Sequence, residues 1–282
     1  MSHPIDKLTA MRLGLLVFVG LALLTAVEFG IALLVNFWQL LLLVSLFKAG
    51  LVMVYYMHVG KLFEAEAEPE PHVQADGVRP EGSHTAGADA IRPYGHPDQH
   101  SYAYKLLTNR IGLWLFLISD AFIFGGLLIA RINLLGLARP ELSQVLGLIV
   151  TSVLLVSSFF MNRAETAMAH GDRKQFALSI SVTLALGLLF LVGVVGVEWR
   201  IAPFGPQDGV AGAVFYSMTG FHAFHVFTGV IFLFIVLRNG LRGRYSAEKH
   251  WGVEACAIYW HFVDVVWIFF YPALYLIGTV LP

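Results

Sequence analysis

Two histidines three residues apart, His222 and His225 in the apolar stretch from Gly220 to Gly229, are the first candidates for chemistry in this sequence. Such a pair can serve as metal or haem ligands, as a proton relay or as a structural hydrogen-bonding pair. A metal site needs three or four converging ligands, and haem needs an axial histidine that faces a large cavity. Residues three apart point about 60° apart around a helix. We therefore expect no metal or haem on this pair.

Other ionisable residues lie in similarly apolar surroundings, where each is costly and needs a partner or a cavity. Glu254, His261 and Asp264 share one stripe of a predicted helix, because offsets of seven and ten residues return to nearly the same face. His261 and Asp264, three residues apart, can touch directly. We interpret these groups as one buried polar cluster that supports structure or proton uptake, with these members: Asp120, His222, His225, Glu254, His261 and Asp264.

Asp120 lies near the middle of its apolar run and must be hydrogen-bonded, paired or protonated. Its depth, at about 1.5 Å per residue, matches that of His225 in an antiparallel helix, with His222 as the second choice. Either a structural pair or a proton relay would use this contact. The residues alone leave both interpretations open.

Glu28 and Lys48 flank a predicted turn at Asn36–Trp38, about two and three helical turns away from it. The long lysine side chain can cover the difference in depth. We therefore predict an ion pair that fixes the two helices as a hairpin. A satisfied pair of this kind needs no further role in transport.

The composition predicts an integral membrane protein of all-α fold class. The chain has 282 residues, of which 57% are hydrophobic and 13% charged, and its net charge of −1 gives no basic face for nucleic acid. Its one cysteine, Cys256, is expected to be a buried, inert thiol, and the first apolar run is expected to be a mature helix rather than a signal peptide. About 20 apolar residues cross a membrane. Seven segments are long enough: Leu13–Val35, Leu40–Val59, Ile111–Ile132, Leu142–Met161, Phe176–Val197, Val214–Leu237 and Val253–Val280.

A segment rich in Glu, Pro, Gly and Ala divides the chain into two membrane modules. We predict a two-helix hairpin at 1–62, a solvated acidic linker at 63–101 and a five-helix bundle at 102–282. Lys and Arg in short loops mark the cytoplasmic side. This rule puts the N-terminus and the linker in the cytoplasm of a bacterial cell and the C-terminus outside. The basic residues that decide it follow the fourth and sixth helices: Arg163, Arg173, Lys174, Arg238, Arg242, Arg244 and Lys249.

The C-terminal two-thirds of the chain, from Tyr102, resembles subunit III of cytochrome c oxidase in its five-helix form. The resemblance rests on "RIGLWLFLISDAFIFGGLL" from Arg110, "GFHAFHVFTGVIFL" from Gly220 and "HWGVEACAIYWHFVDVVWIFFYPALYL" from His250. One residue departs from the pattern, because the family usually has Glu where Asp120 stands. The N-terminal part is similar to the small bacterial subunit IV, through "TAVEFGIALL" and "FKAGLVMVYYMHVGKL", although that family usually has a third helix. The chain thus resembles a fusion of subunits IV and III.

The resemblance implies a non-catalytic subunit of a proton-pumping haem-copper terminal oxidase in the aerobic respiratory chain. It implies no redox centre in this chain, haem and copper in partner subunits I and II, a phospholipid bound between helices, and support for proton uptake, within a larger respiratory supercomplex where one forms. His222 and His225 are then structural and electrostatic groups rather than ligands. Accessory subunits of quinol oxidases and nitric oxide reductases share the five-helix form and stay open. A secondary transporter or channel with a relay through Asp120, His225 and Asp264 is the alternative from another class.

Overall fold

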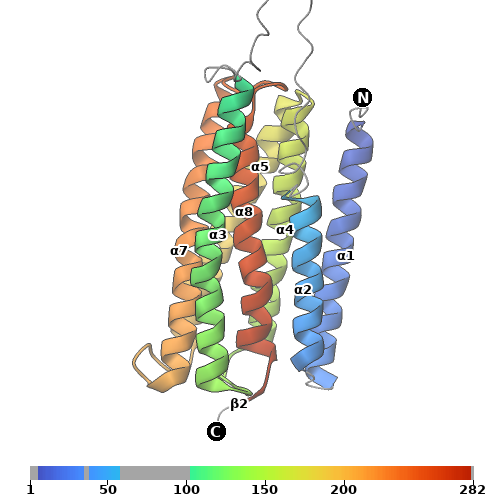
Figure 1. Cartoon of the computed structure of the whole chain (residues 1–282). Helices are drawn as coiled ribbons and strands as arrows, with labels where there is room; N and C mark the ends of the chain where they lie inside the picture. Colours follow the sequence, from blue (N-terminus) through green and yellow to red (C-terminus); the bar gives the residue numbers. More distant parts are fainter. Residues whose placement is uncertain (1–5, 35–37, 58–101, 281–282) are drawn as a thin grey trace, which may run out of the picture.

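The computed structural model describes residues 6–34, 38–57 and 102–280, and these form seven helices long and apolar enough to span a membrane. The predicted all-α fold with seven spans is thereby confirmed, whereas the linker predicted at 63–101 lies outside the described residues. Figure 1 shows the helices running up and down side by side. The long helices are α1 (Lys7–Leu34), α2 (Trp38–Tyr55), α3 (Tyr102–Leu135), α4 (Gln144–Ala169), α5 (Arg173–Leu191), α7 (Gly209–Leu241) and α8 (Trp251–Tyr271).

The last helix ends earlier than the predicted Val253–Val280, so that prediction is wrong at its C-terminal end. Pro272, which has no backbone N–H, follows α8 and begins a π-helical segment, η3 (Pro272–Leu276). Gly278 then turns the chain with φ of +101°, a conformation that favours glycine. Beyond it the strand β2 (Thr279–Val280) pairs in parallel with β1 (Ala138–Arg139).

The fifth span also changes from α-helix to π-helix near its C-terminal end. After α5 the chain continues as a π-helical segment, η2 (Val192–Glu198), and a short helical turn, α6 (Trp199–Ile201). Tyr216 of α7 donates hydrogen bonds from its hydroxyl to the carbonyls of Trp199 and Phe204, at 3.0 and 3.1 Å. These bonds fix the turn between α6 and α7 at the end of the bundle that also holds the C-terminus.

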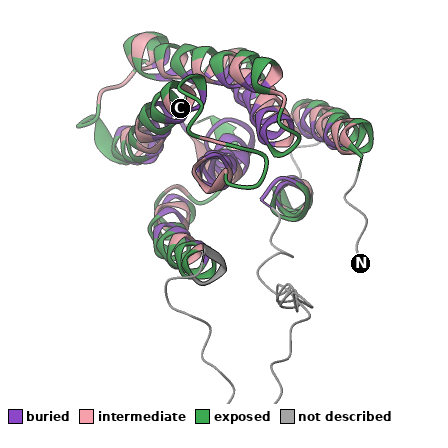
Figure 2. Cartoon of the chain, turned by 90° about the horizontal axis from the view of Figure 1, so that it is seen from above, coloured by how far each residue is buried: buried purple, intermediate pink, exposed green. Residues whose placement is uncertain are grey.

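Helix α8 is the centre of the fold. Of its most apolar stretch 83% is buried, against 22–39% for the other six helices. It packs against α2, α3, α4 and α7, while α1, α4, α5 and α7 follow one another around it (Figure 2). The helices around α8 leave an opening between α2 and α3, because these two helices pack on α8 but not extensively on each other.

Helix α3 contacts the rest of the protein through one narrow seam. Its buried residues fall seven, three, four and seven positions apart, the spacing of a coiled-coil seam: Arg110, Leu117, Asp120, Phe124 and Arg131. Three of these five side chains are ionisable. The attachment of α3 to α7 and α8 therefore depends on polar contacts as well as on apolar packing.

The hairpin packs directly on the five-helix bundle, with α1 against α4 and α2 against α8. Gly14 allows a close approach, since a Cβ there would lie 2.5 Å from Asn162 Oδ1. Near the N-terminus Lys7 Nζ donates to Asp172 Oδ2 at 2.7 Å, in the connection between α4 and α5. This bond, together with one from the backbone N–H of Gln175, holds the pKa of Asp172 below its ordinary value. Its contribution to hairpin docking is present above the ordinary aspartate pKa and is lost as pH falls through the lowered value.

Small residues let two helices approach the ring of Trp260 at the middle of α8. A Cβ at Gly187 of α5 would lie 2.6 Å from Trp260 Cη2, and one at Gly229 of α7 would lie 2.9 Å from Cε3. Trp260 itself is fully buried. The two glycines thus make room for the largest side chain of the core.

We expect Gly187→Ala to destabilise the protein by about 1–3 kcal/mol, because the added methyl group overpacks against a buried ring. Gly126→Ala on α3 is the matched control, since a Cβ there meets nothing within 4 Å. Thermal unfolding of the purified protein in detergent measures both variants. A Gly187→Ala protein as stable as Gly126→Ala would show that the Trp260 contact is not tight.

Candidate functional site

The ion pair in the hairpin joins α1 to α2 and is wholly enclosed. Lys48 Nζ donates to Glu28 Oε2, and Ser45 Oγ donates to Glu28 Oε1 at 2.7 Å. Glu28 and Lys48 expose at most 1% of their surface. Because both charges are paired and the carboxylate has a second donor, the arrangement is that of a satisfied buried ion pair.

Removing one partner of this pair leaves an isolated charge in an apolar surrounding, at a cost of roughly 3–5 kcal/mol. We therefore expect Lys48→Met to reduce the amount of folded protein in the membrane far more than the double change Glu28→Gln/Lys48→Met. Quantitative immunoblotting and thermal unfolding measure the difference. Equal loss in the single and the double variant would argue against a coupled pair.

Asp120 of α3 and His225 of α7 lie next to each other. Asp120 Oδ2 is 3.4 Å from His225 Nε2, and both side chains are nearly buried. His225 Nδ1 donates to the carbonyl of Phe221 at 2.7 Å, so Nε2 is the ring nitrogen that faces the carboxyl group. The aromatic ring of Phe124 lies 4.7 Å from the imidazole and covers it on one side. Asp120 and His225 thus lie close enough to interact, and Phe124 shields the contact on one side.

His222 has a separate environment from His225. Its ring lies 4.8 Å from that of Trp267, and the rings of Phe190 and Phe270 are within 6.2 Å. Among the described residues, no protein atom makes a hydrogen bond to either of its nitrogens. The structure therefore brings only His225, not His222, to Asp120.

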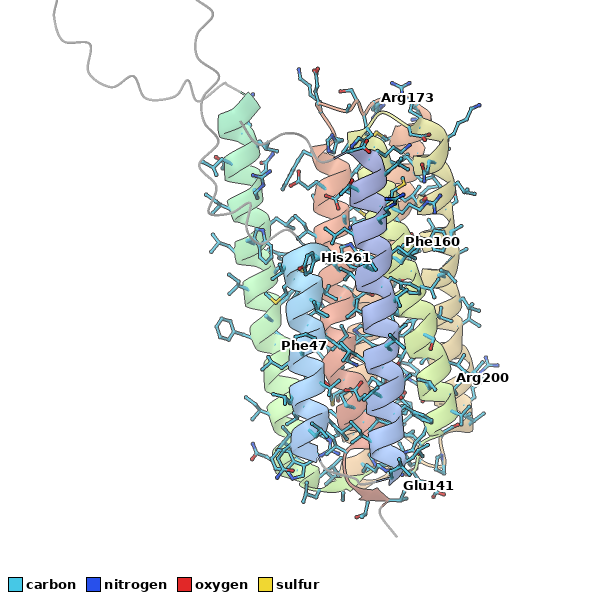
Figure 3. The ribbon with its side chains drawn as sticks, turned by 90° about the vertical axis from the view of Figure 1, so that its right-hand side faces the viewer. Phe47, Glu141, Phe160, Arg173, Arg200 and His261 are labelled. Atoms are coloured by element: carbon cyan, nitrogen blue, oxygen red, sulfur yellow. The ribbon has the colours of Figure 1, made fainter. Side chains whose placement is uncertain are left out.

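A row of polar side chains joins α8 to α4. Trp260 Nε1 donates to Ser157 Oγ at 3.1 Å and Trp267 Nε1 donates to Thr151 Oγ1 at 2.9 Å. His261, labelled in Figure 3, makes a 2.7 Å hydrogen bond through Nδ1 with Ser158 Oγ.

Asp264 belongs to the same region of α8 but does not bond directly to His261. Its Oδ2 lies 3.8 Å from His261 Nδ1, beyond hydrogen-bonding distance, and Ser158 lies beside both groups. The hairpin contributes here too, since the ring of Tyr56 lies 4.9 Å from that of His261. The α4 serine, rather than Asp264, is thus the close partner of His261.

Glu254 does not join the other members of the predicted stripe. Its Oε1 accepts from Arg110 Nη2 at 3.2 Å, so it ties the start of α8 to α3. Glu254 lies two turns before His261 and meets a cation on another helix. The single polar cluster predicted from the sequence is therefore wrong in this respect: the six residues are divided among at least three separate contacts.

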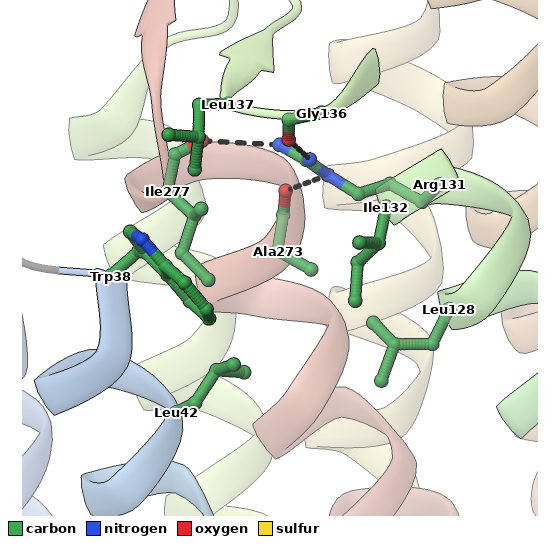
Figure 4. A pocket seen from close by; sticks show the side chains of 9 residues that line it. All are labelled: Trp38, Leu42, Leu128, Arg131, Ile132, Gly136, Leu137, Ala273 and Ile277. Atoms are coloured by element: carbon green, nitrogen blue, oxygen red, sulfur yellow. Dashed lines mark hydrogen bonds between the residues drawn. The ribbon is translucent and has the colours of Figure 1, made fainter. Parts of the chain in front are cut away.

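Arg131 is a buried group that was not among the residues predicted from the sequence. Its guanidinium donates to four backbone carbonyls, and the residue exposes 1% of its surface. Figure 4 draws three of the acceptor residues, Gly136, Ala273 and Ile277. The seam spacing of seven residues from Phe124 was the signal that could have revealed it. These bonds join α3 to the segment after α8, through the carbonyls of Gly136, Ala138, Ala273 and Ile277.

Glu198 is a second buried charge that was not among the residues predicted from the sequence. It lies at the end of η2, exposes 1% of its surface and accepts a 2.6 Å hydrogen bond from the hydroxyl of Tyr275. No pattern in the sequence separates it from an exposed helix-end glutamate. Its position depends on the π-helical segment η2, which the sequence pattern does not predict.

Within residues 6–34, 38–57 and 102–280, no three His, Cys, Asp or Glu side chains come together as a metal site. The arrangement instead links helices in pairs through buried ionisable groups. The fold and these contacts define a polytopic helical membrane protein whose ionisable groups hold its helices together.

Comparison with known proteins specifies this class. A profile of the family "Cytochrome c oxidase subunit III" matches residues 95–279. Cytochrome c oxidase subunit 3 of Sus scrofa is 37% identical over 183 residues, which cover 60% of this chain and 70% of the relative. The subunit 3 of Rhinoceros unicornis is 36% identical over 204 residues, which cover 77% of that relative. The subunit 3 of Pylaiella littoralis is 37% identical over 200 residues, which cover 73% of that relative. The chain belongs to the cytochrome c oxidase subunit III family.

Substitutions at Asp120 and His225 have different expected effects if the two residues form a structural pair and if they form a proton relay. As a structural pair it predicts weaker retention of the protein in Asp120→Leu and His225→Leu, by about 1–3 kcal/mol, with Asp120→Asn largely tolerated because an amide still hydrogen-bonds. A relay predicts normal assembly in Asp120→Asn with loss of proton uptake, since the amide does not titrate. Subunit retention after detergent extraction and proton uptake in vesicles separate the two.

Proposed function

We propose that this chain is a non-catalytic subunit of a haem-copper terminal oxidase, and that it flanks the catalytic subunit I in the aerobic respiratory chain. The observation that carries the proposal is the family match over residues 95–279, which takes in all five helices of the bundle. The same match favours the oxidase over a transporter or channel.

The redox chemistry in this proposal belongs to partner subunits: haem and copper in subunit I, and copper in subunit II where cytochrome c is the donor. Two of the histidines within the spans of this chain have other partners. His225 faces Asp120 and His261 bonds to Ser158. These contacts support a role in which the chain stabilises the complex, and in which Asp120, His225 and Asp264 assist proton uptake by the neighbouring subunit.

A phospholipid fits the opening between α2 and α3. Two apolar grooves meet there at Leu128. One lies against η3 (Figure 4), and the other runs along α8. Trp38, the first residue of α2, lines the groove against η3. Tryptophan favours the membrane interface. We propose that a lipid acyl chain fills the groove along α8, which is lined by Phe124, Gly125, Phe262, Val266 and Phe270 among others.

The N-terminal hairpin is proposed to be a subunit IV-like module fused to the bundle. Its docking on α4 and α8, through Gly14 and Tyr56, supports this, because it holds its place by its own contacts. We propose a bacterial inner membrane with the N-terminus and linker in the cytoplasm. Figure 3 shows Arg173, one of the basic residues on which this orientation rests, at the end of the bundle where α1 begins.

Purification of the native complex through an affinity tag on this chain tests the proposal. We expect co-purifying subunits with haem bands in a reduced-minus-oxidised spectrum, and no stoichiometric iron or copper in the separated polypeptide. Oxidation of reduced cytochrome c, quinol oxidation or nitric oxide reduction by the same sample identifies the type of partner enzyme. Purification without any haem subunit, together with solute transport in liposomes, would overturn it in favour of a transporter.

A further inference from the structure

Three side chains that no proposed role uses lie together in the half of the bundle that holds the C-terminus. The Tyr275 hydroxyl donates to Glu198 Oε1 at 2.6 Å. Tyr271, one helical turn earlier, has its ring centroid 5.7 Å from that of Tyr275. All three side chains expose at most 1% of their surface. They come from η2, η3 and the end of α8, so two π-helical segments meet here, a feature frequent at functional sites.

Two polar atoms of this group have no hydrogen-bond partner among the described protein atoms. They are Glu198 Oε2 and the hydroxyl oxygen of Tyr271. A buried polar atom left unpaired destabilises the fold, and an unpaired charge does so more strongly. Native proteins satisfy such atoms with protein groups or with ordered water.

None of the ion pairs among the described residues includes Glu198. Within this part of the chain, the Tyr275 hydroxyl is the one hydrogen-bond donor to its carboxyl group, and it bonds to one of the two oxygens. The second oxygen therefore calls for a small polar ligand that can donate a hydrogen bond.

The group also lies beside the hairpin, because α2 packs on α8 and contacts η3.

We propose that Glu198, Tyr271 and Tyr275 form an internal water-binding site. A water here donates to Glu198 Oε2, accepts from the Tyr271 hydroxyl and has the Tyr275 oxygen as a third partner, the number of bonds typical of a buried water. The site does not depend on the oxidase function, because it follows from the contacts within this chain.

Radiolytic footprinting with mass spectrometry tests the site in the full-length chain within its native complex. Hydroxyl radicals formed from a bound water oxidise the side chains beside it. We expect clear modification of Tyr271 and Tyr275 although both are buried. Trp260 is the internal comparison, because it is equally buried and its Nε1 already donates to Ser157. Modification of both tyrosines no greater than that of Trp260 would overturn the proposal.

Variants identify the groups that hold the water. Tyr271→Phe removes a hydroxyl that bonds no described protein atom, so the fold is expected to persist while modification of Tyr275 falls several-fold. Glu198→Leu should abolish it, and Glu198→Gln should preserve it because the amide still binds water. Glu141→Gln, an exposed glutamate at the same end of the bundle, is the control. Unchanged Tyr275 modification in Tyr271→Phe would refute the site, even if Glu198→Leu does not fold.

Discussion

The hydrogen bonds between α8 and α4 are the contacts around which the other helices are arranged. Trp260, His261 and Trp267 carry polar nitrogens into a helix that has protein on almost every side. In a membrane interior these nitrogens cannot turn to water. Serine and threonine hydroxyls of α4 bond to Trp260 Nε1, His261 Nδ1 and Trp267 Nε1, and these bonds fix the rotation of α8 relative to α4. Gly187 of α5, Gly229 of α7 and Tyr56, which follows α2, then pack around α8 in the orientation that these hydrogen bonds fix.

Helix α3 is attached in a different way. Its seam holds Arg110, Asp120 and Arg131, and each meets a partner on another part of the chain: Glu254, His225 and the carbonyls around η3. A membrane helix gains little from apolar burial alone, because lipid tails are as apolar as leucine. Polar contacts at three depths therefore hold α3 in place while leaving an apolar groove on its α2 side. The same separation that opens the groove makes it available to lipid.

The sequence was sufficient for the seven spans because length and hydropathy are properties of each segment by itself. It was also sufficient to place Glu28 opposite Lys48 and Asp120 opposite His225, since depth in an antiparallel pair follows from counting residues at about 1.5 Å each. These predicted partners lie in contact in the structure.

The errors arose where the result depends on which helices are neighbours. Glu254 shares a face with His261, yet it meets Arg110 because α3 lies beside that part of α8. Arg131 and Glu198 stand near helix ends and differ from exposed charges only through the backbone that folds around them. The end of α8 was misplaced because the apolar character continues past Pro272 although the regular helix does not.

The hairpin and the bundle form one folded unit, with α1 packed on α4 and α2 packed on α8. Disulfide cross-linking in native membranes tests it most directly, through Phe18→Cys on α1 and Phe159→Cys on α4, whose ring centroids lie 5.0 Å apart. Phe18→Cys paired with Phe122→Cys on the exposed face of α3 is the control. The account predicts rapid oxidation to a cross-linked form in the first pair and none in the second. Absence of the link in the first pair, or equal linking in both, would contradict it.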